Sequence, residues 1–386
     1  MNKKLIYLQF ARGIAALIVV FHHITASENF YFGVNSFRGF FDPGWNAVDF
    51  FFVLSGFIIY YAHSDDIGRP TQWPRYMSKR LIRIYPIYWV IAGISLVFLL
   101  LKTTKGGNED ISAALTHTSY IVKSLLLIPQ QLSPFLTVAW SLCFEMFFYW
   151  MFGIGILTGK KVCWIFSLTY GCLLFFQLIF PVGNSHHVDI PFFASGFHLE
   201  FLLGILTAYL FKKGTTTVRP FANRSSVSGR QTDGSGKLPA ARPLWTIGLF
   251  LFAVTWMCSW LFPANFGKFT IASRVSYGLA SGLIILGLAQ LRLSKDTALT
   301  RFFALLGDSS YVLYLVHPVV LAILFKSINV MGFHGNKAWI NYGIYPLAAL
   351  FCILTGFLVH LKVEKKILSA LNRFSKSKLK PAVKAS

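Results

Sequence analysis

Charged residues are scarce in this chain of 386 residues, and acidic residues are the scarcest. Asp and Glu number 14 against 36 Lys and Arg, and the four types make up only 13% of the chain, whereas 55% of the residues are hydrophobic. Soluble domains contain about a quarter charged residues. The composition therefore excludes an ordinary soluble enzyme and favours a protein that crosses a membrane many times.

The sequence also lacks a nucleic-acid-binding motif and a framework of paired cysteines. The net charge is +22, but the basic residues fall between apolar runs and form no single patch, so nucleic acid is not an expected partner. The five cysteines include no CxxC pair and have no histidine at metal-ligand spacing. We expect packing cysteines, no metal site and no permanently bound cofactor.

The apolar runs predict an all-α integral membrane protein built as a bundle of about ten transmembrane helices. A helix needs about 20 apolar residues to cross the hydrocarbon core. Ten windows meet that length: 5–26, 45–62, 81–102, 140–158, 162–181, 192–211, 244–262, 271–290, 302–326 and 340–361. Lys and Arg gather in the alternate connections that share a side with the N-terminus, which predicts that both termini are cytoplasmic.

The same pattern divides the chain into a membrane domain and two basic segments. Residues 1–361 form the predicted membrane-embedded domain, interrupted at 212–243 by a segment rich in Gly, Ser, Pro and Arg that we expect to be a disordered cytoplasmic linker. In the tail, 362–386, residues 363–374 place apolar side chains on one helical face and basic ones on another. This arrangement predicts an amphipathic helix that lies on an anionic lipid surface.

Ionisable residues interrupt the first span, which reads RGIAALIVVFHH from residue 12 to residue 23. Eleven helical steps of about 100° place Arg12 and His23 on nearly the same face, roughly 16 Å apart along the axis. His22 points about 100° away. A long ligand with an anionic end could reach both Arg12 and His23. Alternatively, Arg12 snorkels to the headgroups and His23 lies at the outer interface.

Two further arginines precede the third span, in RYMSKRLIRIYPIYW. Arg80 and Arg83 lie one turn apart, an arrangement suited to phosphate oxygens. The basic flank that a cytoplasmic helix end normally carries would also explain this pair.

Carboxylates and histidines occur in the other spans. Asp49 lies at about the depth of His23 and could orient it, and Glu145 in WSLCFEMFFYW needs a partner from another helix because its own helix has no Lys or Arg. The remaining candidates are His198, Glu200, Asp308 and His317. Each alone is typical of a satisfied polar residue between helices, but together they are numerous for a purely structural bundle.

The ordered set of these motifs resembles the acyltransferase-3 family of integral membrane acyltransferases. The matching features are the spacing of Arg12 and His23, VDFFFVLSGF at 48–57, the Arg80 and Arg83 pair before IYPIYW, WSLCFEMFFY at 140–149 and SSYVLYLVHP at 309–318. They occur in the family's order between about residues 5 and 361. The resemblance depends on the whole set, because the first spacing alone is weakly specific.

The resemblance implies a membrane O-acyltransferase of the bacterial inner membrane. Such a protein moves an acyl group, usually acetyl, from cytoplasmic acyl-CoA to a hydroxyl of a cell-envelope glycan such as O-antigen, lipopolysaccharide or exopolysaccharide, or of a lipid-linked sugar. His23 would be the general base, and Arg12, Arg80 and Arg83 would bind the donor phosphates. We expect Asp49, before Glu145, to support the base, and the outer loops 27–44, 103–139 and 182–191 to contact the acceptor.

Two other classes of protein fit parts of the pattern. An ion-coupled transporter or a lipid-linked-sugar flippase would also combine ten helices with intramembrane Arg, His, Asp and Glu, although the sequence has no evident inverted halves and no matched pair of broken helices. A structural or regulatory membrane subunit would tolerate replacement of the arginines and of His23.

Overall fold

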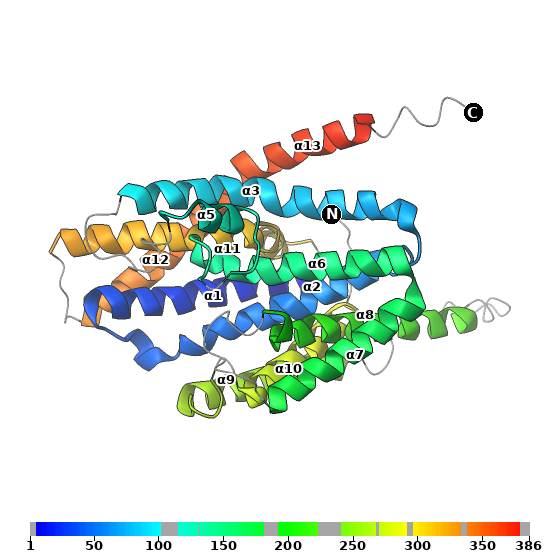
Figure 1. Cartoon of the computed structure of the whole chain (residues 1–386). Coiled ribbons are helices and arrows are strands. Elements are labelled where there is room, and N and C mark those ends of the chain that lie inside the picture. The colour runs from blue at the N-terminus through cyan, green and yellow to red at the C-terminus, as the bar shows by residue number, and fades with distance from the viewer. Residues whose placement is uncertain are drawn as a thin grey trace.

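The fold is a bundle of helices, seen in a computed structural model of the chain (Figure 1). The structure describes residues 5–101, 115–130, 132–180, 192–222, 241–267, 270–291, 296–332 and 338–378. Within these ranges the regular elements are helices and none is a strand. The all-α prediction is confirmed.

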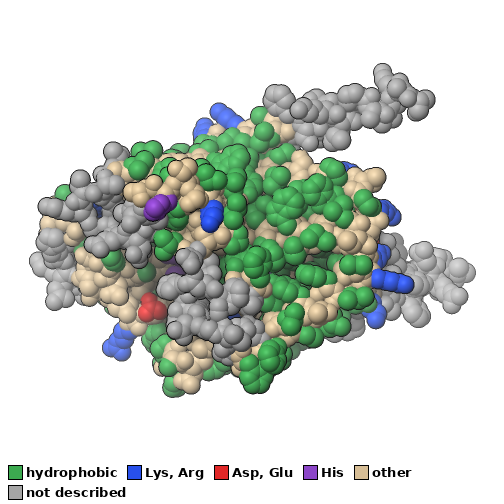
Figure 2. Space-filling view, viewed as in Figure 1, with side chains coloured by type: hydrophobic (Ala, Val, Ile, Leu, Met, Phe, Trp, Pro, Cys, Tyr) green, Lys and Arg blue, Asp and Glu red, His purple; other side chains and the backbone are tan. Residues whose placement is uncertain are grey.

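Ten long helices coincide with the ten predicted spans. They are α1 (Ile6–Phe32), α2 (Ala47–His63), α3 (Trp73–Leu101), α6 (Trp140–Thr158), α7 (Lys160–Ile179), α8 (Phe197–Ala222), α9 (Ala241–Leu261), α10 (Ile271–Leu288), α11 (Ala298–Val330) and α12 (Ala338–Val359). Eight of them are long and apolar enough to cross a membrane; α7 and α8 are outside that set. Hydrophobic side chains cover the middle of the face in Figure 2, and several Lys and Arg lie at its right-hand end.

Shorter elements connect these helices. They are η2 (Ser36–Gly39), η3 (Asp42–Asn46), η4 (Pro70–Gln72), α5 (Thr118–Leu125), η5 (Thr137–Ala139), η6 (Phe192–Ala194), the π-helix η7 (His360–Glu364) and α13 (Lys365–Lys378). Of the predicted linker, 212–222 continues α8, 241–243 begins α9, and 223–240 lies outside the described residues. Of the predicted tail 362–386, residues 362–364 end η7, residues 365–378 form α13, and residues 379–386 are also outside the described residues. The division into domains therefore stays a prediction.

Glycines bring two pairs of helices into backbone contact. A Cβ built on Gly56 of α2 would overlap the carbonyl oxygen of Phe201 in α8, and one on Gly204 would overlap the carbonyl oxygen of Val53. Small residues permit this close approach between membrane helices. The Gly56 position in VLSGF thus serves the packing of α2 on α8.

The second close pair is α1 and α11. A Cβ on Gly307 would overlap the backbone carbonyl of Gln9, and one on Gly13 would lie 2.8 Å from Cγ of Leu306. The two helices therefore run side by side from this point. Their proximity brings the histidines further along each helix within reach of one another.

The segment that contains α5 returns along the middle of α3. Three α3 side chains donate hydrogen bonds to consecutive carbonyl oxygens of the segment: Tyr85 to Leu126, Tyr88 to Ser124 and Trp89 to Leu125. The last carbonyl groups of a helix have no partner within the helix, and here side chains of α3 satisfy those at the end of α5. Part of the predicted outer loop 103–139 is therefore packed against the bundle.

The Gly204→Ala variant should lower the free energy of unfolding, because the new methyl group would force α2 and α8 apart. Overpacking of this kind typically costs about 1–3 kcal/mol. Thermal unfolding of the detergent-purified protein measures the effect. Gly93→Ala is the matched control, since a Cβ there has no atom within 4 Å. Equal melting temperatures of the two variants would contradict the close packing.

Candidate functional site

The predicted arginines meet in one cavity. A cavity of about 340 Å³ lies between α1, α2, α3, α6 and α11. Arg12, Arg80 and Arg83 all line it, and so does Glu145. The structure therefore brings the three candidate donor-binding residues together with one of the two candidate carboxylates.

Arg80 is held in place by an imidazole. Its Nη2 donates to Nε2 of His63 at 2.9 Å, and Nδ1 of His63 donates in turn to Asp66 at 2.7 Å. The guanidinium carbon lies 5.7 and 5.6 Å from the ring centroids of Tyr76 and Tyr149, which adds cation–π contacts. The sequence did not predict this role for His63, because a histidine at the end of a span is typical of the membrane interface.

Arg12 and Glu145 face the same space with different partners. Arg12 donates from Nη1 to Oε1 of Gln9 at 3.0 Å and experiences the charges of Arg83 and Glu145. The Glu145 carboxylate accepts hydrogen bonds from Ser55 at 3.2 Å and from Tyr149. Like charges in an apolar bundle repel each other strongly. The excess of arginines over carboxylates therefore suits an anionic ligand.

A pair of histidines lies near one wall of the cavity. Tyr314 lines it, with its hydroxyl 2.8 Å from both Oγ of Ser141 and the carbonyl oxygen of Val138. The Tyr314 ring centroid lies 5.9 Å from that of His317, which lies 4.8 Å from that of His23. The Tyr314 ring therefore connects the wall of the arginine cavity with the histidine pair.

Backbone carbonyls set the tautomer of both imidazoles. Nδ1 of His23 lies 2.9 Å from the carbonyl oxygen of Val19, and Nδ1 of His317 lies 3.1 Å from that of Leu313. A carbonyl oxygen only accepts, so each Nδ1 carries a proton, and in the neutral imidazole the lone pair is therefore on Nε2. His317 is fully buried, and its Nε2 has no hydrogen-bond partner among the described residues. In their neutral form, both rings thus have Nε2 as the basic atom.

His22 occupies a different environment from His23. It packs against η3, where a Cβ on Gly44 would lie 2.8 Å from Cβ of His22. Its ring centroid is 5.0 Å from that of His23. The different directions of the two adjacent side chains agree with the helical spacing.

Asp49 belongs to a buried charge cluster that the sequence did not reveal. Nη1 of Arg274 in α10 lies 2.7 Å from Oδ1 of Asp49 and 2.9 Å from Oε1 of Glu200. At most 4% of each side chain is exposed. The sequence feature that could have indicated this cluster is an arginine in one predicted span together with carboxylates in two others. The predicted action of Asp49 on His23 stays a prediction.

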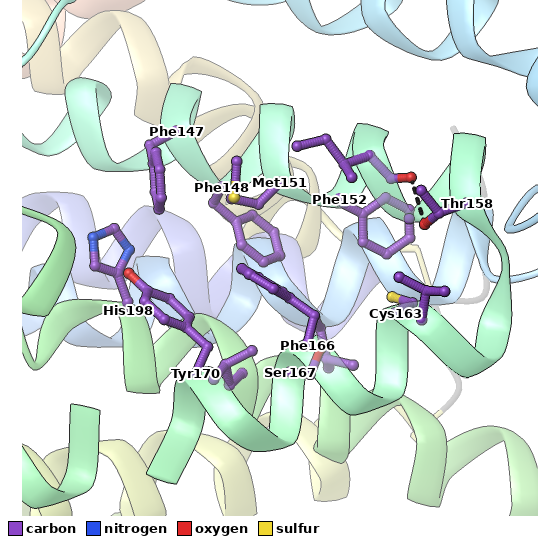
Figure 3. Close-up of a pocket in the computed structure, with 15 residues that line it drawn as sticks. Phe147, Phe148, Met151, Phe152, Thr158, Cys163, Phe166, Ser167, Tyr170 and His198 are labelled. Atoms are coloured by element: carbon purple, nitrogen blue, oxygen red, sulfur yellow. Dashed lines mark hydrogen bonds between the residues drawn. The ribbon is translucent and has the colours of Figure 1, made fainter. Parts of the chain in front are cut away.

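Two other candidates lie apart from the histidine pair. Asp308 contributes to the electrostatic environment of Arg12. His198 is at one end of a separate crevice between α6, α7 and α8, where its Nε2 lies 2.8 Å from the carbonyl oxygen of Phe192 (Figure 3). Within the described ranges, no group of three or more His, Cys, Asp and Glu side chains could hold a metal ion.

The fold and this site describe a class of integral membrane protein, in which three arginines line one cavity and a pair of imidazoles lies next to Tyr314 on the cavity wall. The family model of the acyltransferase domain matches residues 5–373. The chain belongs to that family, the acyltransferase-3 family, and is a multi-pass membrane acyltransferase.

Individual relatives cover most of the chain. The chain is 26% identical over 348 residues to acyltransferase MdmB of Streptomyces mycarofaciens, and the alignment covers 85% of this chain and 81% of the relative. Identity to the exopolysaccharide production protein ExoZ of Rhizobium meliloti (strain 1021) is 24% over 327 residues, or 83% and 86% of the two chains. The putative acetyltransferase ORF330 of Acidianus two-tailed virus is 24% identical over 321 residues, or 81% and 82%. No solved structure matches the chain.

Arg274→Met should destabilise the bundle strongly, because it leaves two buried carboxylates without their cation. Removing one partner of a buried pair typically costs about 3–5 kcal/mol. Thermal unfolding in detergent would show the loss.

Arg301→Met provides the matched control for this substitution. The side chains of Arg301 and its partner Asp296 are 73% and 75% exposed, so we expect little change in melting temperature. A similar decrease in both variants would contradict the stabilising role of Arg274.

Proposed function

We propose that the protein is an O-acyltransferase that moves an acetyl group from cytoplasmic acyl-CoA to a hydroxyl of a cell-envelope glycan, in the inner membrane of a bacterium. The main support is the cavity lined by three arginines, whose wall residue Tyr314 packs near the His317 and His23 pair. Membership of an acyltransferase family favours this function over a carrier or a structural subunit.

The donor phosphates would bind Arg12, Arg80 and Arg83. Arginine binds phosphate oxygens through several N–H groups in a fixed geometry. From Arg12 the α1 axis rises by roughly 16 Å to His23. The pantetheine arm would follow this direction past Tyr314 and present its thioester to the histidine pair.

His23 would act as the general base. As the acceptor hydroxyl oxygen bonds to the thioester carbonyl carbon, its proton passes to Nε2 of His23. Collapse of the tetrahedral intermediate breaks the carbon–sulfur bond, and the proton leaves with the coenzyme A thiol. The products are the O-acetyl ester and free coenzyme A, and His23 is again neutral.

His317 would favour the protonated state of His23. Its ring is 4.8 Å away and neutral, so the proton on His23 meets no second positive charge there. The unprotonated Nε2 of His317 is also a hydrogen-bond acceptor. The pair would therefore accommodate an imidazolium within an otherwise apolar bundle.

The acceptor would approach through an aromatic cavity beside Phe21. This cavity, of about 910 Å³, is lined mainly by aromatic side chains: Phe37, Phe40, Phe41, Trp260, Tyr342 and Tyr345. The Tyr345 hydroxyl donates to the carbonyl oxygen of Phe21 at 2.8 Å, which joins the cavity wall to the turn that carries His23. Aromatic walls are typical of ligand sites. A glycan acceptor also fits the relative that is named for exopolysaccharide production.

His23→Gln should lower acetyl transfer by about 10²–10⁴-fold, the usual contribution of a general base. The assay is turnover of radiolabelled acetyl-CoA by the purified protein, with glycan or water as acceptor, beside a titration of donor binding. Donor affinity should stay unchanged.

His22→Gln is the matched control, and we expect it to retain most of the turnover because His22 packs against Gly44. Substantial turnover by correctly inserted His23→Gln would exclude His23 as the base. If neither the unmodified protein nor the variant binds acetyl-CoA, the proposed donor is wrong.

The double variant Arg80→Ala and Arg83→Ala should raise the dissociation constant of acetyl-CoA by at least about tenfold. Each charged hydrogen bond contributes about 1.5–3 kcal/mol, and a tenfold change corresponds to about 1.4 kcal/mol. Arg69→Ala with Arg75→Ala removes the same charge from exposed positions and should leave the affinity nearly unchanged. Unchanged affinity in the first double variant would remove Arg80 and Arg83 from the donor site.

A further inference from the structure

The hairpin of α6 and α7 encloses a narrow crevice. A single residue, Gly159, joins the two helices with a φ of 103°. Near this turn the helices touch, since a Cβ on Gly155 would lie 2.9 Å from Sγ of Cys163. Between the helices and α8 remains a crevice of about 100 Å³. Figure 3 shows the rings of Phe147 and Phe148 from α6 and those of Phe166 and Tyr170 from α7 along it.

Polar groups in this crevice bond to the protein itself. His198 lies at hydrogen-bond distance from the carbonyl oxygen of Phe192, and Thr158 donates to that of Ile154, the bond drawn in Figure 3. Ile154 and Phe166 are each 46% exposed, so the crevice faces outward from the bundle. An apolar crevice that faces the bilayer suits a hydrocarbon chain.

A basic cavity adjoins the crevice. It has a volume of about 330 Å³ and shares four lining residues with the crevice: Phe152, Cys163, Ser167 and Ile205. Lys160 of α7 and Lys212 and Lys213 of α8 line it, with Asp65 as its one acidic residue. Nζ of Lys212 donates to Oγ of Ser64 and lies 3.6 Å from the Asp65 carboxylate. Among the described residues that line the cavity, three lysines thus stand beside one carboxylate.

Amphipathic aromatic residues also line the basic cavity. Tyr60, Trp164 and Tyr209 come from α2, α7 and α8. The Trp164 ring centroid lies 6.4 Å from that of Tyr60 and 5.5 Å from that of Tyr209. Tyr and Trp are enriched at the level of lipid headgroups. Their presence beside the lysines places this cavity at the depth of a headgroup.

We propose that the two adjoining cavities bind one anionic phospholipid. The phosphate would lie among Lys160, Lys212 and Lys213, and one acyl chain would enter the crevice between α6 and α7. Basic pockets between membrane helices are known to bind anionic headgroups. The lysines lie in segments that the Lys and Arg distribution assigns to the cytoplasmic side. This site is separate from the arginine cavity and does not depend on acyl transfer.

The test is native mass spectrometry of the full-length protein with phosphatidylglycerol and phosphatidylcholine of identical acyl chains. The unmodified protein should retain one phosphatidylglycerol in preference to phosphatidylcholine. Lys160→Gln, Lys212→Gln and Lys213→Gln combined should lower this retention by about tenfold, the effect of about 1.4 kcal/mol. Ser167→Phe, which fills the junction without changing the charge, should also lower it.

The matched control combines Arg69→Gln, Arg75→Gln and Lys161→Gln, which removes the same charge from exposed positions outside the cavity. It should retain phosphatidylglycerol like the unmodified protein. Equal retention of the two lipids by the unmodified protein would overturn the proposal even if a variant fails to fold. Unchanged retention in folded lysine variants, or an equal loss in the control, would also overturn it.

Discussion

The Arg274 guanidinium between Asp49 and Glu200 fixes α10 to α2 and α8 inside the bundle. Burying these groups is favourable only when each charge has its partner, because desolvation opposes every one of them. The register of α2 that results places Ser55 against Glu145. It also sets the start of α2, just after the turn that packs on His22. The geometry on both sides of the cavity therefore depends on this cation.

The buried ionisable groups form two clusters that differ in their ratio of arginines to carboxylates. Arg12, Arg80 and Arg83 share their cavity with Glu145, whereas Arg274 is opposed by two carboxylates. The first cluster thus has more arginines than carboxylates, and the second has fewer. The carboxylates of the second cluster are engaged by Arg274 and do not pair with the arginines of the cavity.

Helix positions and local directions were predictable from the sequence, but partners between helices were not. Apolar length placed the ten long helices, and helical periodicity separated the directions of His22 and His23. By contrast, periodicity does not state which helices are neighbours. The contact of Arg274 with Asp49 and that of His63 with Arg80 therefore required the three-dimensional arrangement. The return of residues 115–130 along α3 was hidden for the same reason, since its partners are side chains 36 to 41 residues earlier.

That returning segment has a consequence for biogenesis. Its carbonyl oxygens are satisfied by Tyr85, Tyr88 and Trp89 of α3, so it has no stable place in lipid before α3 is inserted. Because the segment follows α3 in the chain, its hydrogen-bond partners are already synthesised when it emerges from the ribosome. Its docking on α3 can therefore begin before the later helices of the bundle are made.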